Sequence, residues 1–228
     1  MIESADSLIR WAARAPGARR WDRPGATVVA CAGLAHWDRL VMNGEPDAVA
    51  VLLRAVLAET GESFRPFGTE ELVTEVVARV PELEMSARFA WMETTRRTSR
   101  PMLGQWLAEA DGAEITALIT EAYPESYAWP GDPAVRRWAG VRGAGGELLT
   151  VAAEAWSTPE IGFLSGVATR PSARGRGLGA AICAFTTNEL LDGRDRVALL
   201  VDYRNTAAMA TYTGLGYAVR RVAAARRR

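Results

Sequence analysis

The segment "TRPSARGRGLGAA", residues 169–181, places Gly175, Gly177 and Gly179 at alternate positions, with two arginines among them. Glycine is unfavourable wherever a side chain would serve, so this pattern indicates that backbone amides must approach another group closely. The residues that follow have the apolar spacing of a helix: Leu178, Ile182 and Phe185. The segment therefore predicts a glycine-rich turn that leads into a helix.

Three kinds of structure could account for this turn. The first is a plain turn between a strand and a helix. The second is a dinucleotide fold, because Gly175, Gly177 and Ala180 fit G-x-G-x-x-A and Asp202 ends the next predicted strand. Against it, "RPSAR" separates the strand from the first glycine, and the chain after Asp202 is too short for the further crossover strand that such a fold requires. The third is a pyrophosphate cradle, in which unpaired helix N-terminal amides and two guanidinium groups bind phosphate.

The composition restricts the function classes. The chain has 228 residues, enough for one large domain or two small ones. Its 27 basic and 27 acidic residues give a formal net charge of zero, so neither a nucleic acid nor a membrane is expected as a partner. Every basic residue is arginine, which excludes lysine chemistry.

The scarce metal-ligating residues argue against a metal site. One histidine, His36, and two distant cysteines, Cys31 and Cys183, are too few for a zinc site, and the cysteines are expected to be reduced core residues. The N-terminus lacks the apolar core of a signal peptide, and the longest apolar run, residues 28–34, is too short to span a bilayer. These features predict a cytoplasmic protein without a metal.

Apolar patterning predicts two parts, residues 1–100 and 101–228, because the segment 94–101 is polar, unpatterned and ends in proline. The first part is expected to contain strands near 28–31 and 90–91 and helices over 45–60 and after Thr69. The second is expected to contain a strand within 102–108, a helix over 115–122, a hairpin of 138–142 and 147–156, strands over 161–169 and 197–201, a helix after Asn205 and a strand near Tyr217. No internal repeat is visible, and the terminal arginines are expected to form a solvated tail.

Two motifs together resemble one family. "RGRGLG", residues 174–179, is similar to the R/Q-x-x-G-x-G/A signature of the GNAT superfamily of N-acetyltransferases, and "NTAAMATYTGLGY", residues 205–217, is similar to its N-x-x-A-x-x-x-Y-x-x-x-G-Y/F signature. The resemblance covers roughly residues 105–220. It implies an α/β (α+β) fold with a mixed central sheet, a splayed strand pair and flanking helices. The smaller N-terminal α/β part would be an accessory or degenerate GNAT-like domain.

The resemblance implies an acetyl-CoA-dependent acetyltransferase that transfers the acetyl group directly to a primary amine of a small-molecule or amino-acid-like acceptor. Tyr212 would protonate the leaving thiolate, an amide near Val167 would stabilise the oxyanion, and Thr169 would pair with the pantetheine arm. The residues implied to bind the co-substrate are Val167, Ala168, Thr169, Arg174, Gly175, Arg176, Gly177, Leu178, Gly179 and Asn205.

The residues of the second motif allow a direct interpretation. Ala208 and Tyr212 follow Asn205 by three and seven positions, so the three residues share one face of a helix. Asn205 is a suitable N-cap for that helix. Taken alone, Tyr212 could equally be a core aromatic with a satisfied hydroxyl. The presence of both motifs favours the catalytic role.

The sequence leaves the general base and the acceptor open. Some relatives carry a glutamate where Phe163 stands here. The nearest carboxylates are Glu154 and Glu160, and either could act as the base, directly or through water, although solvated charges at strand ends explain them more simply. His36 is expected to be a surface or satisfied residue. The loop 123–129, with Tyr123, Tyr127 and Trp129, could form an acceptor pocket or pack under itself.

Two other functions are compatible with these motifs. One is a catalytically silent acyl-CoA-binding or regulatory module, and the other is an NAD(P)-binding enzyme. The sequence leaves a homodimer open.

Overall fold

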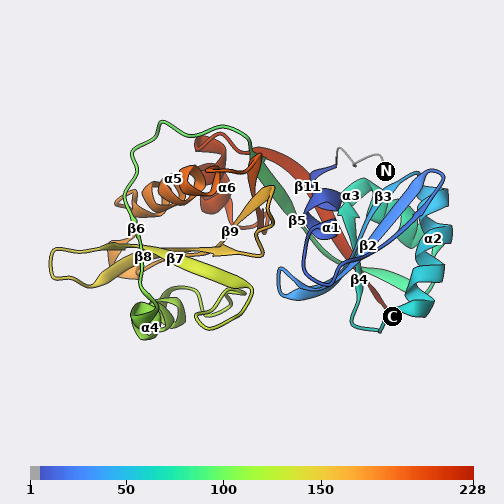
Figure 1. The fold of residues 1–228 in the computed structure, drawn as a ribbon, viewed down its shortest axis with the longest axis horizontal. Helices are drawn as coiled ribbons and strands as arrows, with labels where there is room; N and C mark the ends of the chain where they lie inside the picture. Colours follow the sequence, from blue (N-terminus) through green and yellow to red (C-terminus); the bar gives the residue numbers. More distant parts are fainter. Residues whose placement is uncertain (1–5) are drawn as a thin grey trace. The chain divides into compact units, whose positions relative to one another are not determined.

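The computed structural model describes residues 6–228 and divides the chain into two compact units (Figure 1). Unit 1 contains the chain up to Trp91 together with Arg220–Arg228, and unit 2 contains Met92–Val219. The boundary expected at residues 100/101 lies nine residues beyond the division at 91/92. The last nine residues, expected to belong to the C-terminal part, lie in unit 1.

Unit 1 is built on a mixed sheet. After α1 (Ser7–Ala13), the strands β1 (Arg19–Arg23), β2 (Ala26–Leu34) and β3 (Trp37–Gly44) pair in antiparallel fashion. The chain continues through α2 (Pro46–Glu59), β4 (Arg65–Thr69), α3 (Glu70–Arg79) and β5 (Leu83–Thr94), with β4 parallel to β3. Both predicted helices are confirmed, and the Thr69 hydroxyl accepts a hydrogen bond from the Leu72 amide at 3.3 Å as the N-cap of α3.

Unit 2 also has a mixed sheet, in the order β10-β9-β8-β7-β6. Its elements are β6 (Gln105–Trp106), α4 (Gly112–Ala122), β7 (Val135–Arg142), β8 (Leu148–Ala155), β9 (Ile161–Thr169), α5 (Leu178–Leu190), β10 (Arg196–Val201) and α6 (Thr206–Gly214). β9 and β10 run parallel, whereas the other neighbouring pairs are antiparallel. In Figure 1, α5 and α6 lie on one face of this sheet and α4 on the other. The predicted mixed α/β fold is confirmed, although the strand expected within 102–108 is only two residues long.

The two units repeat one order of elements, which the sequence did not reveal. Each has three antiparallel strands, a helix, a strand parallel to the third, a helix and a last strand: β1-β2-β3-α2-β4-α3-β5 and β7-β8-β9-α5-β10-α6-β11. β11 (Ala218–Arg227) ends the second series but pairs with β4 of unit 1, with Val222 opposite Thr69. The expectation of no repeat is therefore wrong at the level of topology.

The terminal arginines are not a solvated tail. β11 continues to Arg227, whose guanidinium donates to the Leu57 carbonyl. Arg226 forms an ion pair with Glu84 at 2.7 Å. These contacts hold the end of the chain in the sheet of unit 1.

Candidate active site

β9 and β10 separate towards their carboxyl ends. Their parallel register covers Ile161 to Phe163 on β9 and Arg196 to Ala198 on β10, whereas β9 continues to Thr169 and β10 to Val201. The carboxyl halves of the two strands therefore diverge and leave a splayed pair, as the resemblance implied. Backbone groups on the diverging halves can pair with an extended ligand as an added strand would.

A β-bulge lies within the splayed half of β9. Val151 faces Ala168 and Ala153 faces Ser165, so the single residue between them on β8 faces both Gly166 and Val167. Gly166 has φ +58°, and a Cβ there would lie 2.7 Å from Cη2 of Trp138. The bulge thus falls at Val167, whose amide was expected to stabilise the oxyanion. Sequence reasoning missed Gly166, although an isolated glycine inside a strand pattern is a signal for a bulge.

The glycine segment forms an open turn at the start of α5. Gly175 and Gly177 have φ +76° and +74°, and a Cβ at either would project into open space. Gly177 is the N-cap of α5, and the Ala181 amide is bonded to its carbonyl at 3.0 Å. The three amides between them lie before the first intrahelical hydrogen bond and so remain at the positive end of the helix dipole. This geometry fits a bound phosphate.

The turn folds back against the end of β9, so the binding residues expected on the strand and those expected in the turn lie together. A Cβ on Gly179 would lie 3.5 Å from Oγ1 of Thr169. Ala168 is buried, whereas Val167, Thr169 and Leu178 are half-buried.

Two guanidinium groups stand beside this turn. Nε of Arg174 donates to the Thr169 carbonyl at 3.2 Å and its Nη2 to the Ala122 carbonyl at 3.0 Å. Nη2 of Arg176 donates to the Ser172 carbonyl at 3.1 Å. A guanidinium has five N–H donors, so these contacts engage only part of each group and fix both beside the turn.

The corresponding turn of unit 1 has a different chemistry. Between β3 and α2 a single residue, Glu45, takes the N-cap position, and Asp47 lies in the first helical turn. A Cβ on Gly44 would lie only 2.0 Å from the Gly25 carbonyl oxygen, so this corner is closed. Acidic side chains at a helix N-terminus repel a phosphate, so the corner of unit 1 does not fit a bound phosphate.

Tyr212 is the buried residue of α6, with 8% of its surface exposed. Burial, followed by the nearby Cys183 and the two tyrosines Tyr217 and Tyr123, raises the pKa of Tyr212 well above its usual value. Asn205 is the N-cap of α6, as predicted, because its Oδ1 accepts from the Ala208 amide at 3.1 Å. Tyr212 therefore remains protonated at neutral pH, as an acid catalyst requires.

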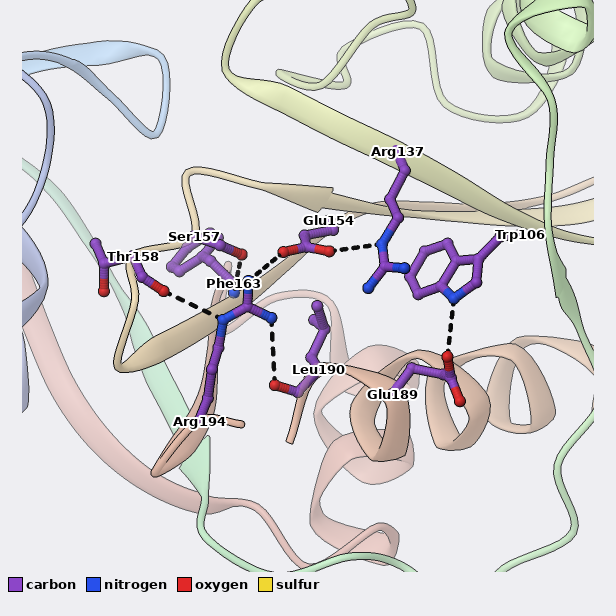
Figure 2. Close-up of polar contacts among 9 residues, drawn as sticks. All are labelled: Trp106, Arg137, Glu154, Ser157, Thr158, Phe163, Glu189, Leu190 and Arg194. Atoms are coloured by element: carbon purple, nitrogen blue, oxygen red, sulfur yellow. Dashed lines mark hydrogen bonds and ion pairs between the residues drawn. The ribbon is translucent and has the colours of Figure 1, made fainter. Parts of the chain in front are cut away.

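Glu154 is fully buried between two guanidinium groups (Figure 2). Its Oε2 lies 2.7 Å from Nε of Arg137 and its Oε1 2.6 Å from Nη2 of Arg194. The expectation of a solvated charge at a strand end is therefore wrong for Glu154. Sequence reasoning missed both arginine partners, because they are 17 and 40 residues away.

The same network continues to β6 and α5. The Arg137 guanidinium carbon lies 3.6 Å from the centroid of the Trp106 ring, and Nε1 of Trp106 donates to Glu189 at 2.9 Å. Arg194 also donates to the carbonyls of Thr158 and Leu190 (Figure 2). These contacts connect β6, β7 and β8 with the carboxyl end of α5, which is a structural role.

Glu160, the second base candidate, lies away from the glycine turn. Glu160 precedes β9, whereas the turn follows the other end of this nine-residue strand, about 30 Å away at roughly 3.3 Å per residue. Phe163 is buried in β9 with 2% of its surface exposed. His36 belongs to unit 1.

The aromatic loop after α4 divides into two parts. Trp129 is half-buried and donates from Nε1 to the Ser126 carbonyl at 2.6 Å, so it packs under the loop. Tyr123 and Tyr127 are 45% and 47% exposed. Partial burial, followed by the nearby Tyr127, Glu125 and Asp202, raises the pKa of Tyr123.

The dinucleotide hypothesis is wrong for this fold. Such a fold needs a further parallel strand beyond the one that Asp202 follows. Here the chain after α6 enters β11, which is antiparallel to β4 of unit 1. Asp202 instead pairs with Arg204 at 2.8 Å, and hydrogen bonds from Arg204 lower the pKa of its carboxyl.

Within residues 6–228, no group of three or more His, Cys, Asp or Glu side chains could hold a metal ion. Over the same residues, no helix is both long and apolar enough to cross a membrane.

Comparisons with known sequences match the part of the chain that contains the turn. The family model described as "FR47-like protein" matches residues 141–226. Mycothiol acetyltransferase of Salinispora arenicola (strain CNS-205) is 46% identical over 63 residues, which are 27% of this chain and 20% of that protein. The match thus spans about a fifth of the length of this curated relative.

Solved structures share the fold over nearly the whole chain. A GCN5-related N-acetyltransferase from Kribbella flavida superposes with a TM-score of 0.66 at 17% identity, covering 98% of this chain and 96% of its own. A GCN5-related N-acetyltransferase from Sphaerobacter thermophilus gives a TM-score of 0.61 at 14% identity, covering 89% and 76%. These matches establish the fold, and their coverage includes both units.

Proposed function

We propose that the chain is a GNAT-type acyltransferase that uses acetyl-CoA to acetylate an amine, with its co-substrate site in unit 2. The observation that carries the proposal is the open glycine turn at the N-terminus of α5, flanked by Arg174 and Arg176. The acetyl group is transferred directly to a primary amine of a small-molecule or amino-acid-like acceptor.

The co-substrate is bound by the turn and the splayed strands. The pyrophosphate accepts hydrogen bonds from the amides of Leu178 and Gly179 and ion pairs with the two arginines. The pantetheine arm lies along the diverging end of β9 and pairs with the backbone of Thr169. Asn205 fixes the start of α6, which carries Tyr212.

Transfer proceeds in one displacement at the thioester. The neutral amine attacks the carbonyl carbon, a C–N bond forms, and the amide at the bulge, Val167, stabilises the negative oxygen. The C–S bond then breaks, and Tyr212 donates its proton to the departing thiolate sulfur. The amine loses its extra proton to solvent, because Glu154 is engaged by two guanidinium groups and Glu160 lies at the far end of β9.

Two features support a small acceptor. The matched relative is named mycothiol acetyltransferase. In this chain Tyr123 and Tyr127 are large exposed aromatics on the loop that follows α4, next to the Ala122 carbonyl that Arg174 contacts. Exposed aromatic side chains of this kind commonly line small-molecule sites.

Calorimetric titration with acetyl-CoA tests the proposal, with CoA and NADH as parallel ligands. We expect micromolar binding of both CoA species and none of NADH. Gly177→Val should weaken acetyl-CoA binding tenfold or more, because the new side chain fills the space of the phosphate.

Gly193→Val is the matched control for this variant. Gly193 also has φ +74° and open space at its Cβ position, but it follows the other end of α5. Equal affinities of the Gly177 and Gly193 variants would overturn the cradle. Binding of acetyl-CoA without thiol release over a panel of amines would instead favour a silent acyl-CoA-binding module.

A further inference from the structure

A cavity lies in unit 2, outside the candidate active site described above. Its volume is about 530 Å³, within the usual range for small-molecule sites. It is lined by the end of β5 with the segment after it, the start of β10 and the turn after α6: Glu93–Arg100, Arg196, Gly214–Gly216 and Ala218. Much of this lining belongs to the polar segment 94–101, which the sequence predicts to be a boundary between two parts.

The charge in and around this cavity is predominantly positive. Four guanidinium groups line it, those of Arg96, Arg97, Arg100 and Arg196. Glu93 pairs with Arg196 at 2.7 Å, and Asp192, just beyond α5, pairs with Arg97. The cluster therefore has two more positive than negative charges, which favours an anion.

Hydrogen bonds hold the cavity wall in a fixed arrangement. Thr98 is held to α5 by two hydrogen bonds, from its amide to Oδ1 of Asn188 at 2.9 Å and from Nδ2 of Asn188 to its carbonyl at 3.0 Å. Arg100 donates from Nε to the Gly214 carbonyl at 3.2 Å, which fixes its guanidinium across the segment. Nε of Arg196 is buried without a hydrogen-bond partner, and such a donor is commonly satisfied by a bound ion or water.

The cavity is separate from the glycine turn. Asn188, which anchors the lining segment, is ten residues after Leu178 along α5, a distance of about 15 Å at roughly 1.5 Å per residue. A ligand at one end of α5 therefore does not occupy the site at the other end.

We propose that this cavity binds a small phosphate monoester, with Arg96 and Arg100 holding the phosphate group. Guanidinium groups bind phosphate through paired, charge-assisted hydrogen bonds. The remaining volume, lined by the hydroxyl-bearing residues Thr95 and Ser99, accommodates the organic part of the ligand. The site is thus a second ligand site, additional to that for acetyl-CoA.

Calorimetric titration with inorganic phosphate at low salt tests this site, using the full chain saturated with CoA. We expect one phosphate per chain, and a dissociation constant about tenfold higher for each arginine replaced in Arg96→Gln and Arg100→Gln. Arg136→Gln, an exposed arginine on β7, is the matched control and should bind as the wild type does. Malonate, titrated in parallel, should bind more weakly than phosphate.

The outcomes separate the two sites. Phosphate binding that survives Arg96→Gln and Arg100→Gln but is lost in Gly177→Val would place the ion at the glycine turn and overturn the proposal. Equal loss in Arg136→Gln would show diffuse surface binding and would also overturn it, as would no binding to the wild type or tighter binding of malonate. Circular dichroism of each variant verifies that its fold is intact.

Discussion

Replacing Glu154 by glutamine separates its structural role from a catalytic one. The substitution keeps the size of the side chain but removes the negative charge between Arg137 and Arg194. The Arg194 side chain is only 11% exposed, so its charge would remain buried without a carboxylate. We therefore expect a loss of stability, with the acetyl-transfer chemistry retained.

The magnitude follows from the burial of each partner. Breaking a buried ion pair by removing one member costs about 3–5 kcal/mol. Arg137 is 37% exposed and partly hydrated, so its contact adds little, and glutamine can still accept one hydrogen bond. We therefore expect the lower end of the range, about 3 kcal/mol. For a chain of this size that corresponds to a decrease in Tm of about 6–12 °C.

Thermal unfolding and steady-state kinetics below the transition measure the two effects. Glu160→Gln is the control, because Glu160 is only half-buried, and it should shift Tm by less than about 2 °C. For Glu154→Gln, kcat at 20 °C should remain within about threefold of the wild type. A hundredfold loss of kcat with an unchanged Tm would refute the structural role and identify Glu154 as the general base.

Three further predictions concern other parts of unit 2 and the cysteines. Tyr212→Phe should lower kcat about a hundredfold and leave the affinity for CoA unchanged, and an unchanged kcat would exclude Tyr212 as the acid. The kcat of the wild type should show no alkaline decline below about pH 10, because the raised pKa of Tyr212 keeps its phenol protonated. Burial raises the pKa of Cys31 to about 11 and the pKa of Cys183 to about 12. Neither thiol should therefore react with a disulfide reagent at pH 8 until denaturant is added, and reaction of the native protein within minutes would contradict their burial. Gly166→Ala should destabilise the protein by about 2–4 kcal/mol in urea unfolding, from left-handed strain and the contact with Trp138, whereas a loss below 1 kcal/mol would argue against the bulge.

The sequence by itself determined the local features of this protein. The helices over 46–59 and 70–79 follow from apolar spacing and end signals within one or two turns. The left-handed turn at Gly175 and Gly177 and the cap at Asn205 follow from the chemistry of single residues. Such features depend on neighbours no more than four positions away, so they can be inferred without the fold.

Only the tertiary structure decided the features that depend on distant pairing. Glu154 reads as an ordinary charged residue until the fold brings Arg137 and Arg194 to its two oxygens. The repeated order of elements in the two units and the position of β11 beside β4 depend on strand order. Many different side chains are compatible with the same strand order, so it cannot be inferred from the sequence pattern. The bulge at Gly166 and Val167 and the arginine-lined cavity likewise exist only once register and packing are fixed, because the contacting residues are far apart in the chain.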